Sequence, residues 1–148
     1  MNGSKPIGEK MKGTAKKVVL LLALVSASMA HADFNKGYAC LQSGDYSCAE
    51  KELRLAADQG HEESQYFLAA LYASDKLGKR DYAEAAKLLH LAADQGHEKA
   101  PYGLGLAYEN GDGVPQSKKT AKEWYRKACD NGAQSGCKRY RKLNKAGY

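Results

Sequence analysis

Several features that would assign a chain to a common functional class are missing from this sequence. Its longest apolar run, Val18 to Val25, is far shorter than the ~20 residues that a membrane-spanning helix needs. No glycine-rich loop that could cradle a phosphate is present, and the segment Asn110–Gly113 lacks the acidic spacing and the closing glutamate of a calcium loop. The sequence therefore predicts no cofactor, no metal and no stable membrane anchor in the mature protein.

The amino-terminal part has the pattern of a secretory signal peptide. Lys12, Lys16 and Lys17 directly precede the apolar run, and Ala30-His31-Ala32 after it fits a small-x-small cleavage site. We expect residues 1–32 to be an N-terminal extension and signal peptide, starting at the first or the second methionine, and residues 33–148 to be the mature domain. No cysteine lies near the cleavage site, so lipid attachment is not expected. The predicted destination is the periplasm or the outside of the cell.

An exact repeat dominates the mature part. The eight residues Leu55–Glu62 return unchanged as Leu91–Glu98, and a looser copy, Lys127–Gln134, follows at the same offset of 36 residues. A fixed period of this size is typical of a solenoid built from stacked supersecondary units. Each copy contains good helix formers followed by a glycine, the residue favoured just past a helix C-terminus. The repeat boundary is thus predicted to be a helix end followed at once by a new helix start.

Apolar residues recur at intervals of three and four, which indicates helices throughout the mature part. The expected elements are helices at 34–42 and 46–58, a unit over 61–96 with a loop near 74–80, a unit over 97–132, and a capping helix at 137–143. Ala69 and Gly105 occupy positions where helices approach closely, and His61 and His97 are interpreted as helix starts rather than catalytic groups. The predicted fold is all-α, a right-handed solenoid of about three helix pairs plus a C-terminal capping helix.

All four cysteines fall in the predicted mature part, and an even number in an exported chain indicates disulfides. Cys40 and Cys48 are eight positions apart across a short turn, and so are Cys129 and Cys137. Residues about four positions either side of a tight helix–helix turn face each other at the ~5.5 Å that a disulfide requires. Because Cys40 and Cys129 belong to opposite ends of the stack, we expect the two local pairs. Zinc binding is the rival interpretation, but neither spacing matches the usual ligand pairs.

The net charge of +6 is unevenly distributed. Residues 33–117 hold 8 basic and 14 acidic side chains, whereas residues 118–148 hold 10 basic and 2 acidic ones. An acidic body with a basic tail suggests a field that steers a partner or supports head-to-tail stacking, although a solvated terminal helix explains the same pattern. The predicted export and the scarcity of aromatic stacking platforms among the lysines argue against nucleic acid as a partner.

The third unit carries the most diagnostic residues, which are Leu104-Gly105, Tyr108, Gly111-Asp112-Gly113-Val114 and Lys127-Ala128 before Gly132. This pattern resembles the Sel-like repeat family, relatives of the tetratricopeptide repeats, over residues 33 to about 137. The second unit departs from it, with Leu68-Ala69 in place of Leu-Gly and Lys76-Leu77-Gly78 in place of Gly-x-Gly-Val. The paired cysteines further resemble those of exported, cysteine-rich members. The resemblance implies pairs of antiparallel helices.

We predict that the chain binds a protein or peptide through a concave face formed by the first helix of each pair. The residues expected on that face are Phe34, Tyr38, Tyr66, Tyr102 and Leu106, with Glu63, Lys99 and Glu109 at its edges. Tyrosines suit recognition because the ring contributes area at low entropic cost while the hydroxyl forms hydrogen bonds. Packing between repeats is the alternative role for each of these tyrosines.

An enzymatic alternative rests on one short motif. Ser135-Gly136-Cys137-Lys138 matches Ser-x-x-Lys, the nucleophile motif of penicillin-interacting enzymes, but the Ser-Asp-Asn and Lys-Thr-Gly motifs that such enzymes need are absent. On the basis of this single match, a small penicillin-binding or cell-wall-related hydrolase is the alternative to a non-enzymatic scaffold.

Overall fold

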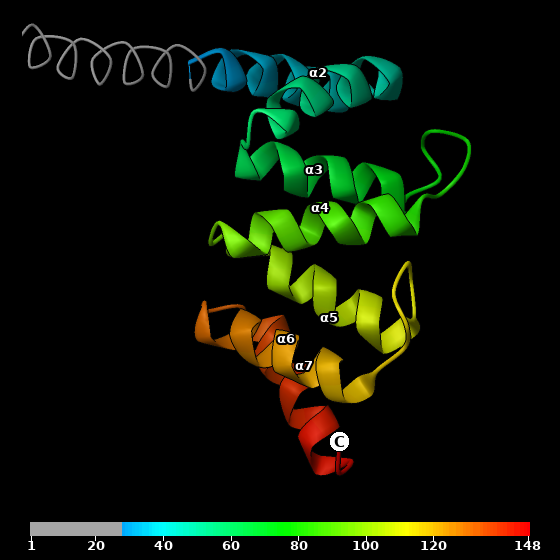
Figure 1. Ribbon diagram of the computed structural model, residues 1–148, viewed down its shortest axis with the longest axis vertical. Helices are drawn as coiled ribbons and strands as arrows, with labels where there is room; N and C mark the ends of the chain where they lie inside the picture. Colours follow the sequence, from blue (N-terminus) through cyan, green and yellow to red (C-terminus); the bar gives the residue numbers. More distant parts are fainter. Residues whose placement is uncertain (1–27) are drawn as a thin grey trace, which may run out of the picture.

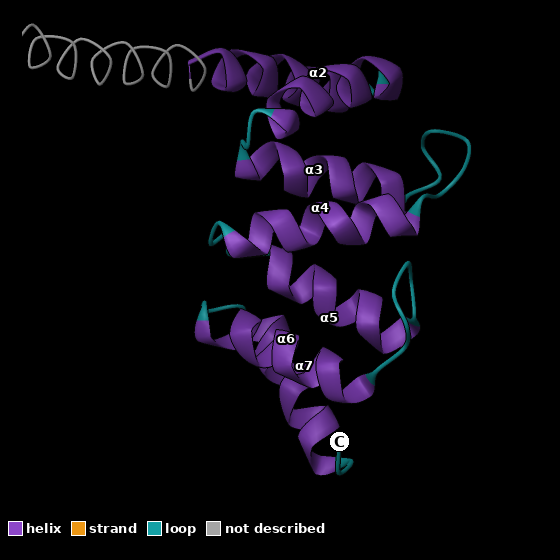
Figure 2. Cartoon of the chain, viewed as in Figure 1, coloured by secondary structure: helices purple, strands orange, loops and turns teal. Residues whose placement is uncertain are grey.

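A computed structural model describes residues 28–148, which form a stack of antiparallel helices without strands (Figures 1 and 2). The first described helix covers residues 28–43. It is followed by α2 (Tyr46–Asp58), α3 (Glu62–Ala73), α4 (Tyr82–Asp94), α5 (Ala100–Asn110), α6 (Lys118–Asp130) and α7 (Gln134–Lys145). Each helix packs mainly against the next one along the chain. The predicted all-α solenoid is confirmed.

Two elements are longer than the sequence predicts. The first helix begins before Phe34 and runs across the predicted cleavage position between Ala32 and Asp33. Helix α7 covers Gln134–Lys145 instead of the predicted 137–143. Its start is earlier because it begins directly after the repeat-boundary turn, as α3 does. The preceding part of the predicted signal peptide, residues 1–27, lies outside the described residues.

The three repeat boundaries have the predicted geometry. Gly60, Gly96 and Gly132 follow the ends of α2, α4 and α6 with φ angles of 84°, 96° and 92°, a left-handed conformation that costs glycine little. In two of the three cases, a histidine side chain then accepts a hydrogen bond from the first turn of the next helix. His61 Nδ1 accepts a hydrogen bond from the backbone N–H of Ser64 at 3.2 Å, and His97 Nδ1 accepts one from Ala100 at 3.2 Å. The interpretation of both histidines as helix starts is therefore confirmed.

Small residues allow the helices to approach closely. A Cβ atom added to Gly105 on α5 would overlap the ring of Tyr125 on α6, which is fully buried. Ala69 on α3 is likewise buried in the core formed by α2, α3 and α4. The expected close helix contact is confirmed at Gly105, and at Ala69 the structure shows a buried side chain.

Both predicted disulfides are present. Cys40 is bonded to Cys48 with a Cα–Cα distance of 5.7 Å, and Cys129 to Cys137 with one of 4.5 Å. Each bond links the two helices that flank a short turn, one at each end of the stack. No free cysteine remains among the described residues.

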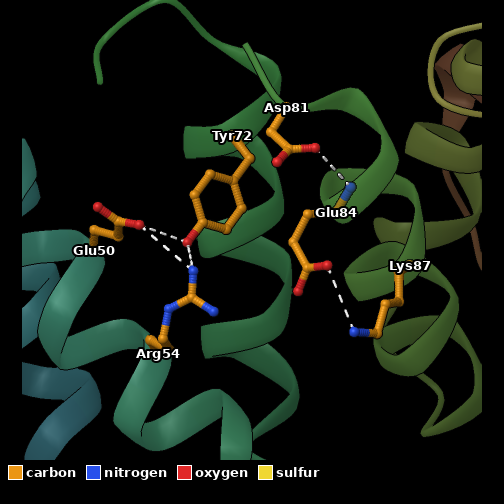
Figure 3. A network of polar contacts seen from close by, with 6 residues as sticks. All are labelled: Glu50, Arg54, Tyr72, Asp81, Glu84 and Lys87. Carbon is orange, nitrogen blue, oxygen red and sulfur yellow. Dashed lines mark hydrogen bonds and ion pairs between the residues drawn. The ribbon is translucent and has the colours of Figure 1, made fainter. Parts of the chain in front are cut away.

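A tyrosine, a carboxylate and an arginine connect the first two repeat units (Figure 3). The Tyr72 hydroxyl of α3 donates to Glu50 Oε1 of α2 at 2.7 Å, and the Arg54 guanidinium contacts both groups. Burial, and then the hydrogen bond to Glu50, raise the pKa of Tyr72 well above its usual value. The same view shows Asp81 capping α4 through the backbone N–H of Glu84.

Candidate binding groove

A cavity of about 700 Å³ opens beside α3, α4 and α5, and the turn between α6 and α7 closes one end of it. We call it the α3–α5 cavity. It is lined by Tyr66, Ala69, Ala70, Ala73, Tyr82, Ala85, Ala86, Leu89, Glu98, Lys99, Tyr102, Gly103, Leu106, Ala107, Asn110, Asp112, Asn131, Gly132, Ala133 and Ser135. Its volume falls in the range of sites that hold a small molecule or a few side chains of a peptide.

Alanines create the space in this cavity. Ala69, Ala70 and Ala73 lie on α3, and Ala85 and Ala86 lie on the facing part of α4. Because none of these side chains extends beyond Cβ, the two helices leave room that larger residues would fill. The lining is consequently mainly apolar, with polar groups at the ends of the cavity.

Two tyrosines from successive repeats stand in the cavity wall. Tyr66 on α3 and Tyr102 on α5 both line the cavity and are half-buried. The ring of Tyr66 stacks on that of His97 with 4.4 Å between centroids, and Tyr102 lies 5.6 Å from the ring of Tyr125. Tyr66 thus packs against the first residue of the next unit and Tyr102 against its own unit, and both also line the cavity. Packing, the alternative role weighed from the sequence, is therefore present in both side chains, and their role in recognition stays a prediction.

Four of the eight residues predicted on the concave face come together in the cavity lining, namely Tyr66, Tyr102, Leu106 and Lys99. Glu63 lies nearby as a half-exposed side chain with its carboxylate 3.5 Å from His97 Nε2, but it does not line the cavity.

Phe34 and Tyr38 belong to a separate aromatic cluster at the amino-terminal end of the stack. Phe34 stacks on His61 at 4.8 Å between centroids, and Tyr38 packs edge-on against Phe67 at 5.3 Å. Tyr66 contacts the same Phe67 at 5.6 Å, so this cluster borders the cavity without lining it.

Glu109 lies between helices rather than at the rim of the cavity. Its carboxylate accepts a hydrogen bond from the Tyr125 hydroxyl at 2.6 Å and from Arg139 Nη1 at 3.2 Å, and its side chain is only 15% exposed. Burial, and then the bond to Glu109, raise the pKa of Tyr125, and the charge of Glu109 raises the pKa of Arg139. Glu109 therefore links α5, α6 and α7.

Sequence reasoning missed the part of the lining that comes from the second helices and the turns. Tyr82 and Leu89 lie on α4, and Asn131 lies in the turn after α6. The prediction drew only on the first helix of each pair. The run of alanines on α4 was the available signal, but alanines at helical spacing are equally typical of a packed helix interface.

Ser135, the candidate nucleophile, lies at the edge of the cavity on the first turn of α7. Within residues 28–148, no side chain forms a hydrogen bond with its Oγ atom. In the same part of the chain, no three His, Cys, Asp or Glu side chains are grouped closely enough to hold a metal ion. No helix among the described residues is long and apolar enough to cross a membrane.

Stacked antiparallel helix pairs with a concave cavity on one side define this chain as a helical-repeat solenoid. Residues 62–97 and 99–132 each match the family model of the Sel1 repeat. The chain therefore contains two Sel1 repeats, a repeat type that typically serves as a scaffold for protein–protein interaction. No curated protein sequence matches the chain significantly.

The solved structures with a similar fold include the following three. One is c5321, a protective antigen present in uropathogenic Escherichia coli strains and displaying an SLR fold, with 27% identity and a TM-score of 0.73 over 79% of this chain. A Sel1 repeat protein from Oxalobacter formigenes has 23% identity and a TM-score of 0.66 over 75% of the chain. Helicobacter pylori cysteine-rich protein B has 21% identity and a TM-score of 0.59 over 91% of the chain.

These neighbours differ in length. The chain spans 26% of c5321 and 46% of the Oxalobacter protein, but 98% of the Helicobacter protein. Because the Oxalobacter and Helicobacter proteins are only 23% and 21% identical to this chain, their similarity shows the fold alone.

Proposed function

We propose that this protein is an exported scaffold that binds an extended segment of a protein or peptide partner in the α3–α5 cavity. The observation that carries the proposal is the open, mainly apolar cavity whose wall contains Tyr66 and Tyr102 from successive repeats. An extended peptide places alternate side chains on one side, so two repeat-related tyrosines can contact two of them. Half-buried tyrosines also lose little side-chain entropy on binding.

Export is supported by the two disulfides and by the signal-peptide pattern. Disulfides persist in oxidising compartments such as the periplasm and the cell exterior. N-terminal sequencing of the protein recovered from its natural host should begin at Asp33. Recovery of an uncleaved chain from the cytoplasm would contradict the proposed location.

The binding role is tested by truncating the two tyrosines and measuring affinity and stability separately. A random peptide library selected on the mature protein supplies the ligand. Tyr66→Ala and Tyr102→Ala should each weaken binding of the selected peptides by about five- to thirtyfold, which corresponds to ~1–2 kcal/mol for an interface aromatic. Tyr148→Ala is the matched control, because Tyr148 is exposed and lies outside the cavity. Unchanged affinity of the folded Tyr66 and Tyr102 variants would show that the peptide binds elsewhere.

Incubation with a labelled penicillin tests the hydrolase alternative. We expect no covalent adduct at Ser135, because no described side chain forms a hydrogen bond with its Oγ atom. An adduct that disappears in Ser135→Ala would favour the enzyme over the scaffold.

A further inference from the structure

Helix α7 is a third copy of α3 and α5 in the same register. The buried positions of the three helices coincide after shifts of 36 residues: Ser64, Ala100 and Gly136 near their starts, and Leu71, Ala107 and Leu143 near their ends. The cavity lining follows the same register, since Lys99 and Ser135 are 36 positions apart and both line it. The concave face therefore continues from α5 onto α7, the last helix of the stack in Figure 1.

The register identifies which α7 side chains extend this face. The position of Tyr66 and Tyr102 corresponds to Lys138, and the position of Leu106 corresponds to Lys142. Both lysines are exposed. They are four residues apart on one helix, which places their Cβ atoms ~6 Å from each other. Along the concave face, aromatic and apolar side chains are thus followed by two ammonium groups.

These two charges are not neutralised within the described part of the chain. Helix α7 contains five basic residues and no acidic one. Arg139 is paired with Glu109, but no carboxylate in residues 28–148 forms an ion pair with Lys138 or Lys142. The end of the concave face at α7 consequently carries an uncompensated positive charge.

We propose that the partner segment carries bulky apolar side chains followed by a cluster of carboxylates, with the apolar part in the α3–α5 cavity and the carboxylates over Lys138 and Lys142. A peptide fits both halves of this surface, whereas a phosphate polymer or an anionic lipid surface supplies no side chains for a cavity lined by alanine, leucine and tyrosine. This inference rests on the proposed function and specifies the chemistry of its ligand.

Three labelled peptide libraries test the inference with the full mature chain. All share one half drawn from leucine, isoleucine, phenylalanine and tyrosine, and the other half is glutamate, glutamine or lysine. The glutamate library should bind at least ~10-fold more tightly than the glutamine library at low salt, and the difference should shrink as ionic strength rises. In K138Q/K142Q the difference should fall to about twofold or less.

The control is K51Q/K79Q, which removes the same charge from exposed lysines outside the cavity lining and should keep the preference. Equal binding of the three libraries, or preference for the lysine library, overturns the inference and leaves the peptide-binding function standing. If K51Q/K79Q also lost the preference for the glutamate library, the preference would reflect the net charge of the protein rather than the lysines of α7. If none of the three libraries binds, the proposed function itself is overturned.

Discussion

The hydroxyl oxygen of Tyr125 lies 2.6 Å from the carboxylate of Glu109, across the interface between α6 and α5. The Tyr125 side chain is fully buried, and Arg139 Nη1 of α7 donates to both oxygens of the same carboxylate. One glutamate therefore holds three consecutive helices together. The Tyr72–Glu50–Arg54 group performs the same role between α2 and α3.

Removing the Tyr125 hydroxyl should destabilise the fold measurably. In Tyr125→Phe, the Glu109 carboxylate loses a buried hydrogen bond, which costs ~1–3 kcal/mol in the free energy of unfolding. Urea unfolding monitored by circular dichroism gives the value. Tyr38→Phe is the control, because the Tyr38 side chain is exposed and its hydroxyl has no carboxylate partner among residues 28–148. Equal stability of the two variants would show that the bond contributes little.

Alkaline pH should destabilise the protein through Tyr72 and Tyr125. The pKa of each is raised in the folded state by burial and by the hydrogen bond to its glutamate. The stabilisation is fully present below the unfolded-state pKa of ~10 and is lost as pH rises above that value. The melting temperature of the wild type should fall more between pH 9 and pH 11 than that of the Y72F/Y125F double variant. An equal fall in the melting temperatures of the two proteins would show that Tyr72 and Tyr125 do not cause the loss of stability at alkaline pH.

A methyl group at position 105 should disturb the packing of α5 against α6. In Gly105→Ala, the new Cβ would overlap the buried Tyr125 ring, and overpacking of this kind costs ~1–3 kcal/mol. Gly103→Ala is a matched control on the same helix, because its Cβ would meet only the terminal methyl groups of Leu89 at 3.1 Å. If Gly103→Ala lowered the free energy of unfolding more than Gly105→Ala does, the contact between Gly105 and Tyr125 would not be the tightest one on α5.

Reduction should weaken the stack without unfolding it. Each disulfide closes a short loop and contributes ~2–3 kcal/mol in the loop-entropy account. The reduced protein should melt at a lower temperature and keep its helical spectrum, since the core clusters of α2 to α5 consist of alanine, leucine and tyrosine side chains. Complete loss of helicity on reduction would show that the core alone does not support the fold.

The helices and disulfides could be predicted because their causes are local. The segment from Leu55 to Glu62 contains the end of one helix, its glycine and the start of the next, and all three are read from neighbouring residues. The cysteine pairs followed from the turn between them. The bounds of α2 were obtained in full, since Asp45 caps its start and Gln59 ends it.

The candidate groove was only half predictable because it depends on contacts between repeats. The register placed Tyr66 and Tyr102 on one face, but nothing near Glu109 in the sequence shows that Tyr125 and Arg139 surround its carboxylate. The contribution of α4 was missed for a similar reason. Whether an alanine such as Ala85 borders a cavity or a neighbouring helix depends on the size of residues one unit away.

Because Leu55–Glu62 and Leu91–Glu98 are identical, one whole repeat unit could be removed or added without a new sequence at the junction. A deletion of residues 61–96 would join Gly60 directly to His97, and the junction would read as the same eight residues that already connect α4 to α5. An insertion of the same segment would create no new junction either. Removing or duplicating this segment would therefore shorten or extend the concave surface by one whole unit, while the turns between units keep their sequence.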